Sequence, residues 1–343
     1  MASKIKVIVV GIGEMGGQAV EMILEKKNLE IVGAVGHRRG VGEDLAKMVG
    51  LQRDLGIIVS ADAEKIFNTV EADVVLHFSA STMKDTCFQT KGALETGKNV
   101  ITIAEEASFP WLTGKEVAEE IDKIAREKGV TFVGTGINPG FMFDYFPITV
   151  TGALKRVNKI HIVRVVDFSR YGPIVWEHIG VGKHPDSFKD GLDNGDIVLH
   201  VGLEQTVNIV AKAMGWDLDD FKELQEGIIS KSRRESKYGV VEPGTICGFK
   251  QIGTGFINGK EVIVQDITGS ILPNVEEDGV DVGTYIMIDG IPSVKISIEG
   301  ELAVQGGWGT VARAVNSIPQ VISAQPGILT VDQLPPSPCL PGK

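Results

Sequence analysis

One stretch decides the fold of the first part of the chain: Lys6-Val-Ile-Val-Val-Gly-Ile-Gly-Glu-Met-Gly-Gly-Gln-Ala-Val20. The run from Ile5 to Val10 is apolar throughout, which is typical of a parallel strand buried on both faces. From Glu14 to Glu25, apolar residues recur at helical spacing, and one face is made of Met15, Ala19, Val20, Ile23 and Leu24. The stretch therefore predicts a buried strand, a tight loop and an amphipathic helix.

The loop between this strand and this helix has the pattern Gly-x-Gly-x-x-Gly, formed by Gly11, Ile12, Gly13, Glu14, Met15 and Gly16. The first glycine permits the tight turn, the second lets the backbone approach a pyrophosphate, and the third lets the helix pack closely on the strand. The amides at the helix N-terminus then face the phosphates. A purely structural turn is the alternative, but the position of the loop favours dinucleotide binding.

The rest of the first part alternates strand and helix, which indicates an α/β fold with a parallel sheet covered on both faces. Further strands are expected at 30–35, 57–59, 73–78, 99–103 and 131–133, with helices near 42–48, 63–68, 83–96 and 114–128. We therefore expect a dinucleotide-binding Rossmann domain over 1–140. The glycine-rich stretch Gly134-Thr-Gly-Ile-Asn-Pro-Gly140 then marks a hinge.

Beyond the hinge, 141–307 is expected to be an α+β substrate domain with a mostly antiparallel sheet. Helices are expected at 141–154 and 198–213, and strands at 159–168, 226–237, 245–258, 261–268, 282–288 and 293–299. The Asn258-Gly259 pair between two of these strands is a strong hairpin signal. A final helix is expected at 308–324, which Pro319 could break, and the proline-rich segment 326–343 is expected to be extended.

Composition excludes several classes of protein. A net charge of -11 argues against nucleic acid as a partner, because phosphate binding needs a field of Lys and Arg. The chain has no apolar run long enough to span a bilayer and no signal-peptide pattern, so we expect no membrane partner and a cytoplasmic enzyme. Three scattered cysteines and six histidines without helical metal spacing predict neither disulfides nor a metal site.

Three segments at the expected carboxyl edge of the sheet hold candidate cofactor and catalytic residues. After the second strand, His37, Arg38 and Arg39 replace the usual acidic residue, which favours the 2′-phosphate of NADP(H). A solvated basic turn that accepts either NAD or NADP is the alternative. At the end of the fourth strand come His77, Phe78, Ser79, Ala80, Ser81 and Thr82. This run is expected to border the nicotinamide ribose, although its hydroxyls could equally cap the next helix.

The fifth strand ends in the acidic pair Glu105-Glu106. In an extended segment adjacent residues point opposite ways, so only one carboxylate is expected to face the cleft. There it could act as a general base, its pKa raised by partial burial. The alternative is that the two acids serve a nearby helix N-terminus.

The chain resembles the 2,4-diaminopentanoate dehydrogenases. The resemblance rests on the glycine loop, the Asn99-Val-Ile-Thr-Ile-Ala-Glu-Glu-Ala-Ser-Phe-Pro110 segment, the Ile137-Asn-Pro-Gly-Phe141 hinge and Asp167-Phe-Ser-Arg-Tyr-Gly172. It implies an N-terminal domain shared with dihydrodipicolinate reductases, and a C-terminal helix, within 308–325, that packs back on the Rossmann domain. It also implies a homodimer formed by the second domain.

The resemblance implies oxidative deamination of 2,4-diaminopentanoate at C4, with Glu105 as the base and Glu106 as the alternative. Candidate partners for the substrate are Asn138, which could also touch the cofactor, Arg170, Tyr171, His178 and Arg313. Dihydrodipicolinate reductase is a competing interpretation, but the stretch from Glu177 to Ser187 only loosely matches its His-His and Ser-Gly-Thr motifs. A reductase or amine dehydrogenase for another small amino or keto acid is the second hypothesis, and a non-catalytic NADP sensor is the third.

Overall fold

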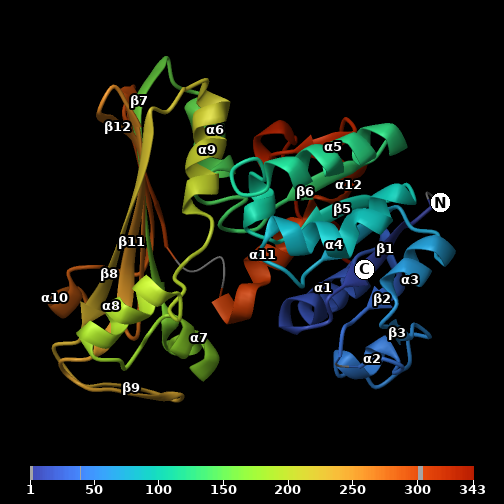
Figure 1. Ribbon diagram of the computed structural model, residues 1–343, viewed down its shortest axis with the longest axis horizontal. Helices are drawn as coiled ribbons and strands as arrows, with labels where there is room; N and C mark the ends of the chain where they lie inside the picture. Colours follow the sequence, from blue (N-terminus) through green and yellow to red (C-terminus); the bar gives the residue numbers. More distant parts are fainter. Residues whose placement is uncertain (1–2, 39, 300–303) are drawn as a thin grey trace. The chain divides into compact units, whose positions relative to one another are not determined.

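The computed structural model describes residues 3–38, 40–299 and 304–343. It divides into two compact units (Figure 1), one formed by residues up to Tyr145 together with Gly306–Lys343, and one formed by Phe146–Gln305. The boundary lies just beyond the glycine-rich hinge expected at residues 134–140.

The first unit is built on a seven-stranded parallel sheet in the order β15-β6-β5-β4-β1-β2-β3. Its strands are β1 (Ile5–Val10), β2 (Leu29–Val35), β3 (Val59–Ser60), β4 (Val74–His77), β5 (Asn99–Thr102), β6 (Thr131–Gly134) and β15 (Gly327–Leu329). The order 3-2-1-4-5-6 is that of a doubly wound Rossmann sheet, so the predicted fold class is confirmed. The strand order reverses between β1 and β4, and ligands of such sheets bind at this switch point.

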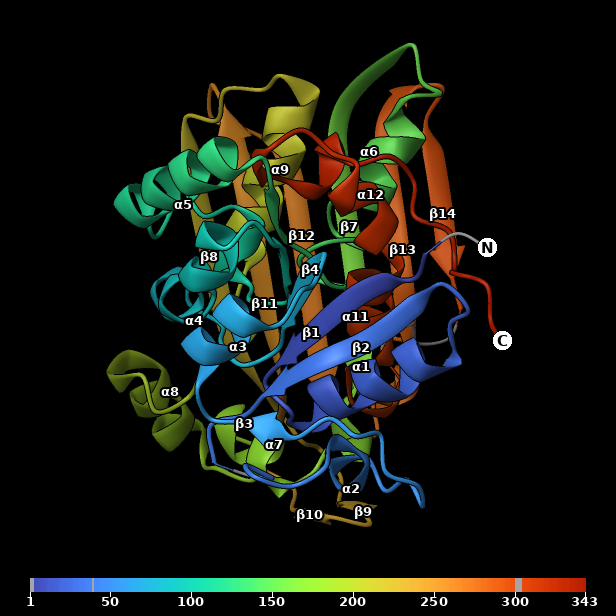
Figure 2. The ribbon, with the colours of Figure 1, turned by 90° about the vertical axis from the view of Figure 1, so that its right-hand side faces the viewer.

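Helices cover both faces of this sheet, as Figure 2 shows, with α3, α4 and α5 on one face and α1 and α12 on the other. The helices of the unit are α1 (Glu14–Glu25), α2 (Leu45–Met48), α3 (Ala63–Thr69), α4 (Met83–Glu95), α5 (Lys115–Lys128), α11 (Val304–Asn316) and α12 (Ile318–Ile322), with the 3-10 turns η1 (Glu106–Ser108) and η3 (Val331–Gln333). The single helix expected at 308–324 is divided near Ser317, because Pro319 opens the short α12. α12 packs on β5 and β6.

The C-terminal segment adds a strand to the parallel sheet that the sequence does not predict. Within the segment 326–343, which is expected to be extended, Gly327–Leu329 forms β15 and pairs with β6 as the edge of the parallel sheet. Ile328 is buried there, and its backbone N–H donates to Asp122 at 2.8 Å. Three residues carry too short a pattern to predict a strand, and the pairing partner lies about 200 positions earlier in the chain. The following prolines form neither helix nor strand.

The second unit contains a six-stranded sheet in the order β14-β13-β7-β12-β11-β8. Its strands are β7 (Arg156–Asp167), β8 (Asp220–Ile229), β11 (Ile246–Ile257), β12 (Lys260–Ser270), β13 (Gly283–Ile291) and β14 (Val294–Ile298), beside the small hairpin β9 (Arg234–Ser236) and β10 (Gly239–Val241). All neighbouring pairs in the large sheet are antiparallel except β7 with β12, which confirms the mostly antiparallel prediction. Asn258 and Gly259 both adopt positive φ in the turn between β11 and β12, as the Asn-Gly signal predicts.

The helices of the second unit are α6 (Tyr145–Thr151), α7 (Pro173–His178), α8 (Pro185–Asn194), α9 (Leu203–Met214) and α10 (Val275–Asp278), with the turn η2 (Phe168–Arg170). Several boundaries differ from those expected from the sequence: α9 begins at Leu203 rather than 198, and α6 and β8 are shifted at both ends. α6 starts later than 141, because the Asp144 side chain accepts from the backbone N–H groups of Gly140 and Tyr145 and ends the preceding loop. β8 starts at Asp220 rather than 226, because this charged edge strand shows no apolar alternation.

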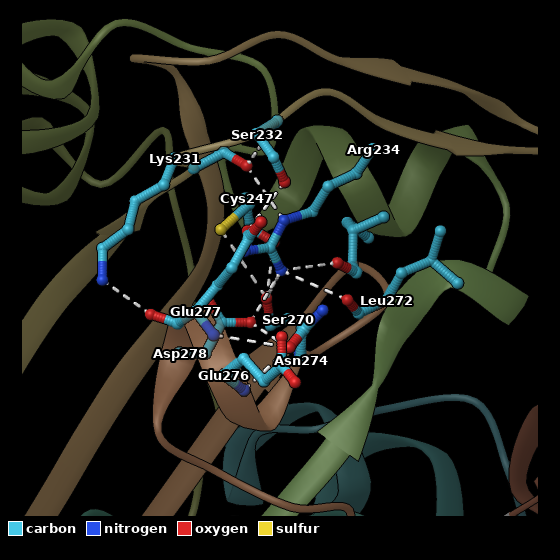
Figure 3. A network of polar contacts seen from close by, with 12 residues as sticks. Lys231, Ser232, Arg234, Cys247, Ser270, Leu272, Asn274, Glu276, Glu277 and Asp278 are labelled. Atoms are coloured by element: carbon cyan, nitrogen blue, oxygen red, sulfur yellow. Dashed lines mark hydrogen bonds and ion pairs between the residues drawn. The ribbon is translucent and has the colours of Figure 1, made fainter.

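A buried ionic network fixes the loop that follows β12, as Figure 3 shows. Arg234 is 4% exposed and binds the Asp278 carboxylate through both terminal nitrogens, at 2.9 and 2.6 Å. The same guanidinium donates to the backbone carbonyls of Ile271 and Leu272 and to Ser270 Oγ. Because acceptors surround the N–H groups of the guanidinium and the Asp278 carboxylate balances its charge, the buried arginine is compensated. The network joins β9 to α10.

Candidate active site

The glycine loop after β1 has the geometry that a dinucleotide requires. Gly11 adopts φ +89°, and a Cβ there would lie 2.7 Å from Ser79 Cβ. A Cβ on Gly16 would lie only 1.8 Å from the Gly11 carbonyl oxygen, so α1 can pack this closely only without a side chain. At Gly13, by contrast, a Cβ would meet nothing within 4 Å. Open space therefore lies over the one glycine whose backbone should approach the pyrophosphate.

The N-terminus of α1 faces this space without a capping side chain. The N-cap residue is Gly13, and no side chain accepts from the first turn of the helix, where Glu14 and Met15 follow. Free backbone amides together with the helix dipole favour an anion at this end. The residues from Gly11 to Gly16 therefore fit the pyrophosphate of a nicotinamide cofactor, which agrees with the prediction for this loop.

The candidate residues for the adenosine end follow β2. His37 and Arg38 are exposed, and His37 Nε2 lies 3.3 Å from Gln89 Oε1. Arg39, the second predicted guanidinium, lies outside the described residues. An exposed arginine after β2, with no acidic residue at positions 36–38, is free to bind a 2′-phosphate.

The hydroxyls after β4 have separate roles. Thr82 is the N-cap of α4: its Oγ1 accepts from the Asp85 backbone N–H and donates to the Asp85 carboxylate. Of the two roles expected for Thr82, the structure therefore shows helix capping, and its hydroxyl already has hydrogen-bond partners in α4. Ser79 instead donates its hydroxyl to Gln89 Oε1. Phe78 and Ala80 are half-buried, and the Phe78 backbone N–H donates to the Val10 carbonyl, next to Gly11.

A buried histidine connects the ends of β4 and β5. His77 is 0% exposed; its Nε2 lies 3.0 Å from Gln89 Oε1 and its Nδ1 lies 2.9 Å from Thr102 Oγ1. Since Gln89 Oε1 accepts, Nε2 carries the hydrogen and Nδ1 accepts from the threonine. Burial lowers the pKa of His77 to about 4, so the imidazole is neutral. The sequence interpretation did not include Gln89 in the site, because the contacts that join it to His77 come from separate elements.

The acidic pair after β5 lies in a helical turn rather than in an extended strand. Glu105 has αR geometry as the N-cap of η1, which corrects the expectation that the two side chains alternate across a strand. The Glu106 carboxylate accepts the backbone N–H of Met83 at 2.7 Å, at the N-terminus of α4. Gly134 permits the close approach of this turn to β6, because a Cβ there would lie 2.3 Å from Ala107. Glu106 therefore has the helix-terminus role that was the alternative for the pair.

Glu105 is the carboxylate of the pair that the fold leaves available. Burial raises the pKa of Glu105, while hydrogen bonds from its own backbone and from the Ser81 side chain act in the opposite direction. Its backbone carbonyl is held by the Ser108 N–H and hydroxyl. A half-buried carboxylate with a raised pKa, held on a rigid turn at the carboxyl edge of the sheet, can serve as a general base near neutral pH.

The hinge holds a second charged cluster within the first unit. Arg313 of α11 is buried, and its guanidinium carbon lies 5.0 Å from the Phe141 ring centroid and 5.2 Å from that of Tyr145. Asp144 is fully buried beside it, and burial raises the pKa of Asp144 to about 6 against the pull of Arg313. The Arg313 charge is thus engaged with aromatic rings and Asp144, so its role as a substrate ligand stays a prediction.

Asn138 is the unusual polar group of the hinge. Its side-chain amide nitrogen and oxygen are both buried, and neither has a hydrogen-bond partner among the described residues. It precedes Pro139 through a cis peptide bond, and a Cβ on Gly140 would lie 2.1 Å from the Gly136 nitrogen. Buried amides are normally hydrogen-bonded, so this one is available to a ligand. Its role beside cofactor and substrate stays a prediction.

The remaining substrate candidates belong to the second unit. Arg170 is exposed at the end of η2, and the Tyr171 ring lies 5.0 Å from that of Phe168. His178 ends α7, where it is exposed, and its carbonyl accepts from Val198. His178 thus lies on a short helix. Their roles toward the substrate stay predictions.

The described part of the chain shows neither a metal centre nor a membrane span. Among the described residues, no group of three or more His, Cys, Asp or Glu side chains is arranged to hold a metal ion. Within 3–38, 40–299 and 304–343, no helix combines the length and the apolar character needed to cross a bilayer.

Residues 141–343 match the profile of the 2,4-diaminopentanoate dehydrogenase C-terminal domain, and residues 5–103 match that of the dihydrodipicolinate reductase N-terminus. The chain is also 36% identical to the 2,4-diaminopentanoate dehydrogenase of Acetoanaerobium sticklandii over 97% of its length and 94% of that protein. The chain belongs to the 2,4-diaminopentanoate dehydrogenase family. It is therefore an oxidoreductase with a Rossmann unit for a nicotinamide cofactor, and the predicted family is confirmed.

More distant relatives share the whole architecture. An amine dehydrogenase of Streptomyces virginiae is 24% identical over 98% of this chain and 98% of its own. The structure of an amine dehydrogenase from Mycobacterium smegmatis superimposes with a TM-score of 0.83 at 26% identity, covering 98% of this chain and 97% of that one. A scyllo-inositol dehydrogenase from Lactobacillus casei shares only the fold, with a TM-score of 0.57 at 13% identity over 96% of this chain and 92% of its own.

Proposed function

We propose that the enzyme oxidises the C4 amine of 2,4-diaminopentanoate with NADP as the oxidant, giving 2-amino-4-oxopentanoate, ammonia and the reduced cofactor. The observation that carries the proposal is Glu105, a carboxylate with a raised pKa that follows β5, at the same carboxyl edge of the parallel sheet as the glycine loop after β1. Its neighbour Glu106 is occupied at the α4 terminus. The name and the extent of similarity of the A. sticklandii relative support the substrate.

The residues of the chain divide the reaction into proton steps and positioning. Glu105 accepts a proton from the C4 ammonium, which leaves a neutral amine from which C4–H can depart as hydride. The bound nicotinamide supplies the hydride acceptor. Glu105 releases this first proton to solvent and then takes a proton from water as the water adds to the substrate iminium. Glu105 returns that proton to the nitrogen of the carbinolamine, which leaves as ammonia while the hydroxyl loses its proton and becomes the carbonyl. Overall, one water is consumed, and C4 loses two electrons as the C–N bond is replaced by a carbonyl.

Around these steps, the neutral His77 with Ser79 and Gln89 holds the end of β4 in place. We assign the unpartnered amide of Asn138 to the substrate and the nicotinamide side of the cofactor. Arg170 and Tyr171 remain our proposed partners for the substrate carboxylate and its α-ammonium group.

NADP preference rests on Arg38, which is exposed after β2 where an acidic residue would repel a 2′-phosphate. We expect initial rates with 2,4-diaminopentanoate to be higher with NADP than with NAD. Arg38→Ala should raise the KM for NADP about tenfold and leave that for NAD within about twofold, because only the 2′-phosphate contact is lost. Equal effects on both cofactors would contradict the assignment of Arg38, though not the function.

The same assay tests the substrate when 2,4-diaminobutyrate, ornithine and alanine are compared. We expect the largest kcat/KM for 2,4-diaminopentanoate. No turnover of any of the four would overturn the proposed function, and a preference for a monoamine would favour the alternative of an amine dehydrogenase for another small substrate.

We also propose a homodimer formed by the second unit. α9 packs on one face of the six-stranded sheet, on β11 and β12, and Figure 1 shows α6 on that side too. The opposite face carries half-buried apolar side chains, among them Val163, Ile252, Phe256 and Met287. Such a face suits a second copy of the chain. Sedimentation velocity should give twice the chain mass of 36.8 kDa, and Phe256→Lys should shift the enzyme to monomer. A wild-type monomer at micromolar concentration would refute the dimer.

We place the enzyme in the cytoplasm, as the sequence predicts. The free state of all three cysteines supports a reducing compartment.

A further inference from the structure

The second unit contains a pocket that the proposed reaction does not use. Its volume is about 340 Å³, within the range of roughly 300 to 1,000 Å³ found for small-molecule sites. The walls come from the segment 197–203, the first turn of α9, and the strands β8 and β11. No Lys or Arg is among the described residues that line it. Leu192 and Val198 form its apolar side.

One side of the pocket offers hydrogen-bond donors without partners. α9 begins after Gly202, which has φ +105° and no capping side chain, so the amides of its first turn have no side-chain acceptor. In the same turn, the Gln205 side chain is only 5% exposed, lines the pocket, and has no hydrogen bond within the described part of the chain. Buried amides are rarely left unpaired. Together with the helix dipole, these donors suit a carboxylate.

The other side of the pocket offers a fixed negative charge. Glu223 of β8 accepts from Gln251 Nε2 at 2.7 Å and from Gln225 Nε2 at 2.5 Å. Gln251 is itself held by the backbone of His200, whose N–H donates to Oε1 at 2.9 Å and whose carbonyl accepts from Nε2 at 2.8 Å. The Glu223 carboxylate is therefore positioned before any ligand arrives.

His200 adds no positive charge to the pocket. Burial lowers its pKa to about 4, assisted by the nearby charge of Arg164, so the imidazole is neutral at pH 7. Its Nε2 is buried and has no hydrogen-bond partner in the described structure, so it is a second polar atom available to a ligand. Carboxylates of Glu204 and Glu223 line the same space. The lining of the pocket thus combines anion-binding amides with cation-binding carboxylates.

We infer that this pocket binds a small zwitterionic amino acid, with the ligand carboxylate on the first turn of α9 and Gln205, and the ligand ammonium on Glu223. The apolar side at Leu192 and Val198 receives its side chain. The inference rests on the second unit alone, so it stands or falls independently of the proposed function.

The test is isothermal titration calorimetry on the full chain with L-alanine as the probe, beside acetate and methylammonium as single-charge probes. We expect one L-alanine per chain with a Kd of about 1 mM or lower. Acetate and methylammonium should each bind at least about tenfold more weakly, because each uses one end of the pocket. Absence of L-alanine binding at about 10 mM, or binding of a single-charge probe as tight as that of L-alanine, would overturn the inference.

Variants locate the binding. Glu223→Gln should weaken L-alanine binding at least about tenfold. Gln205→Leu should weaken it severalfold, and this second variant keeps the test valid if Glu223→Gln folds poorly. Glu226→Gln is the matched control: this residue pairs with Lys250 on β11, and its side chain lies on the opposite face of β8. Its effect should stay within about twofold. Equal losses in Glu223→Gln and Glu226→Gln, or loss of binding in Glu105→Gln, would place the ligand elsewhere and refute the site.

Discussion

Glu105→Gln is expected to lower kcat with 2,4-diaminopentanoate by about 1,000-fold or more while the Kd for NADP stays within about threefold. General acid–base groups contribute roughly 10²- to 10⁴-fold to a rate, and glutamine cannot take a proton from the ammonium or from water. The glycine loop that fits the pyrophosphate is separate from this carboxylate. Stopped-flow or steady-state reduction of NADP at 340 nm, with fluorescence titration of the cofactor, measures both quantities.

Glu106→Gln is the matched control for this prediction. It keeps an oxygen that can accept the Met83 N–H but loses the charge at the α4 terminus, so we expect a loss of stability of about 1 kcal/mol or less and a kcat within about tenfold of wild type. If Glu106→Gln abolishes turnover and Glu105→Gln retains it, the two assignments must be exchanged.

The pH dependence gives a second readout of Glu105. A base must be ionised, and burial raises its pKa, so the acidic limb of kcat/KM against pH should lie above the ordinary range of a glutamate, near 4.3. For stability the sign follows from the same shift. A carboxyl whose folded-state pKa is raised favours the folded state at low pH, and this contribution is lost as pH rises through the folded pKa. Glu105→Gln should therefore be at least as stable as wild type at pH 7, which separates lost catalysis from misfolding.

Gly13→Ala is expected to raise the Kd for NADP about 10- to 100-fold while leaving the melting temperature nearly unchanged. The added methyl meets nothing within 4 Å, and Gly13 has φ -87°, which alanine adopts without strain. The methyl would instead occupy the space over which the backbone approaches the pyrophosphate, where charge-assisted hydrogen bonds contribute about 1.5 to 3 kcal/mol. Fluorescence titration and differential scanning calorimetry report the two effects separately.

Gly16→Ala is the contrasting variant. Its Cβ would lie 1.8 Å from the Gly11 carbonyl oxygen, so α1 must move and both stability and cofactor affinity should fall. An unchanged cofactor affinity in Gly13→Ala would show that the pyrophosphate lies elsewhere, even if Gly16→Ala unfolds the domain.

Several features could be predicted because their signals are local. The six strands of the Rossmann sheet follow from short apolar runs, and the Asn258-Gly259 turn follows from two residues that tolerate positive φ. The predicted start of β8 is wrong because this charged edge strand has no alternation of apolar and polar residues. The predicted start of α6 is wrong because the Asp144 side chain accepts a backbone N–H of the preceding loop, so the helix begins later. Both signals depend on neighbours that the linear pattern does not contain.

The sequence by itself determined the cofactor class, because a glycine loop between a buried strand and a helix is a local backbone requirement. It also determined that a carboxylate follows β5. Only the tertiary structure decided which one is free: α4 brings its N-terminus to Glu106, and the same folding leaves Glu105 half-buried with a raised pKa. The physical reason is that desolvation and hydrogen bonding arise from residues far apart in the chain, and their placement exists only once the sheet has assembled.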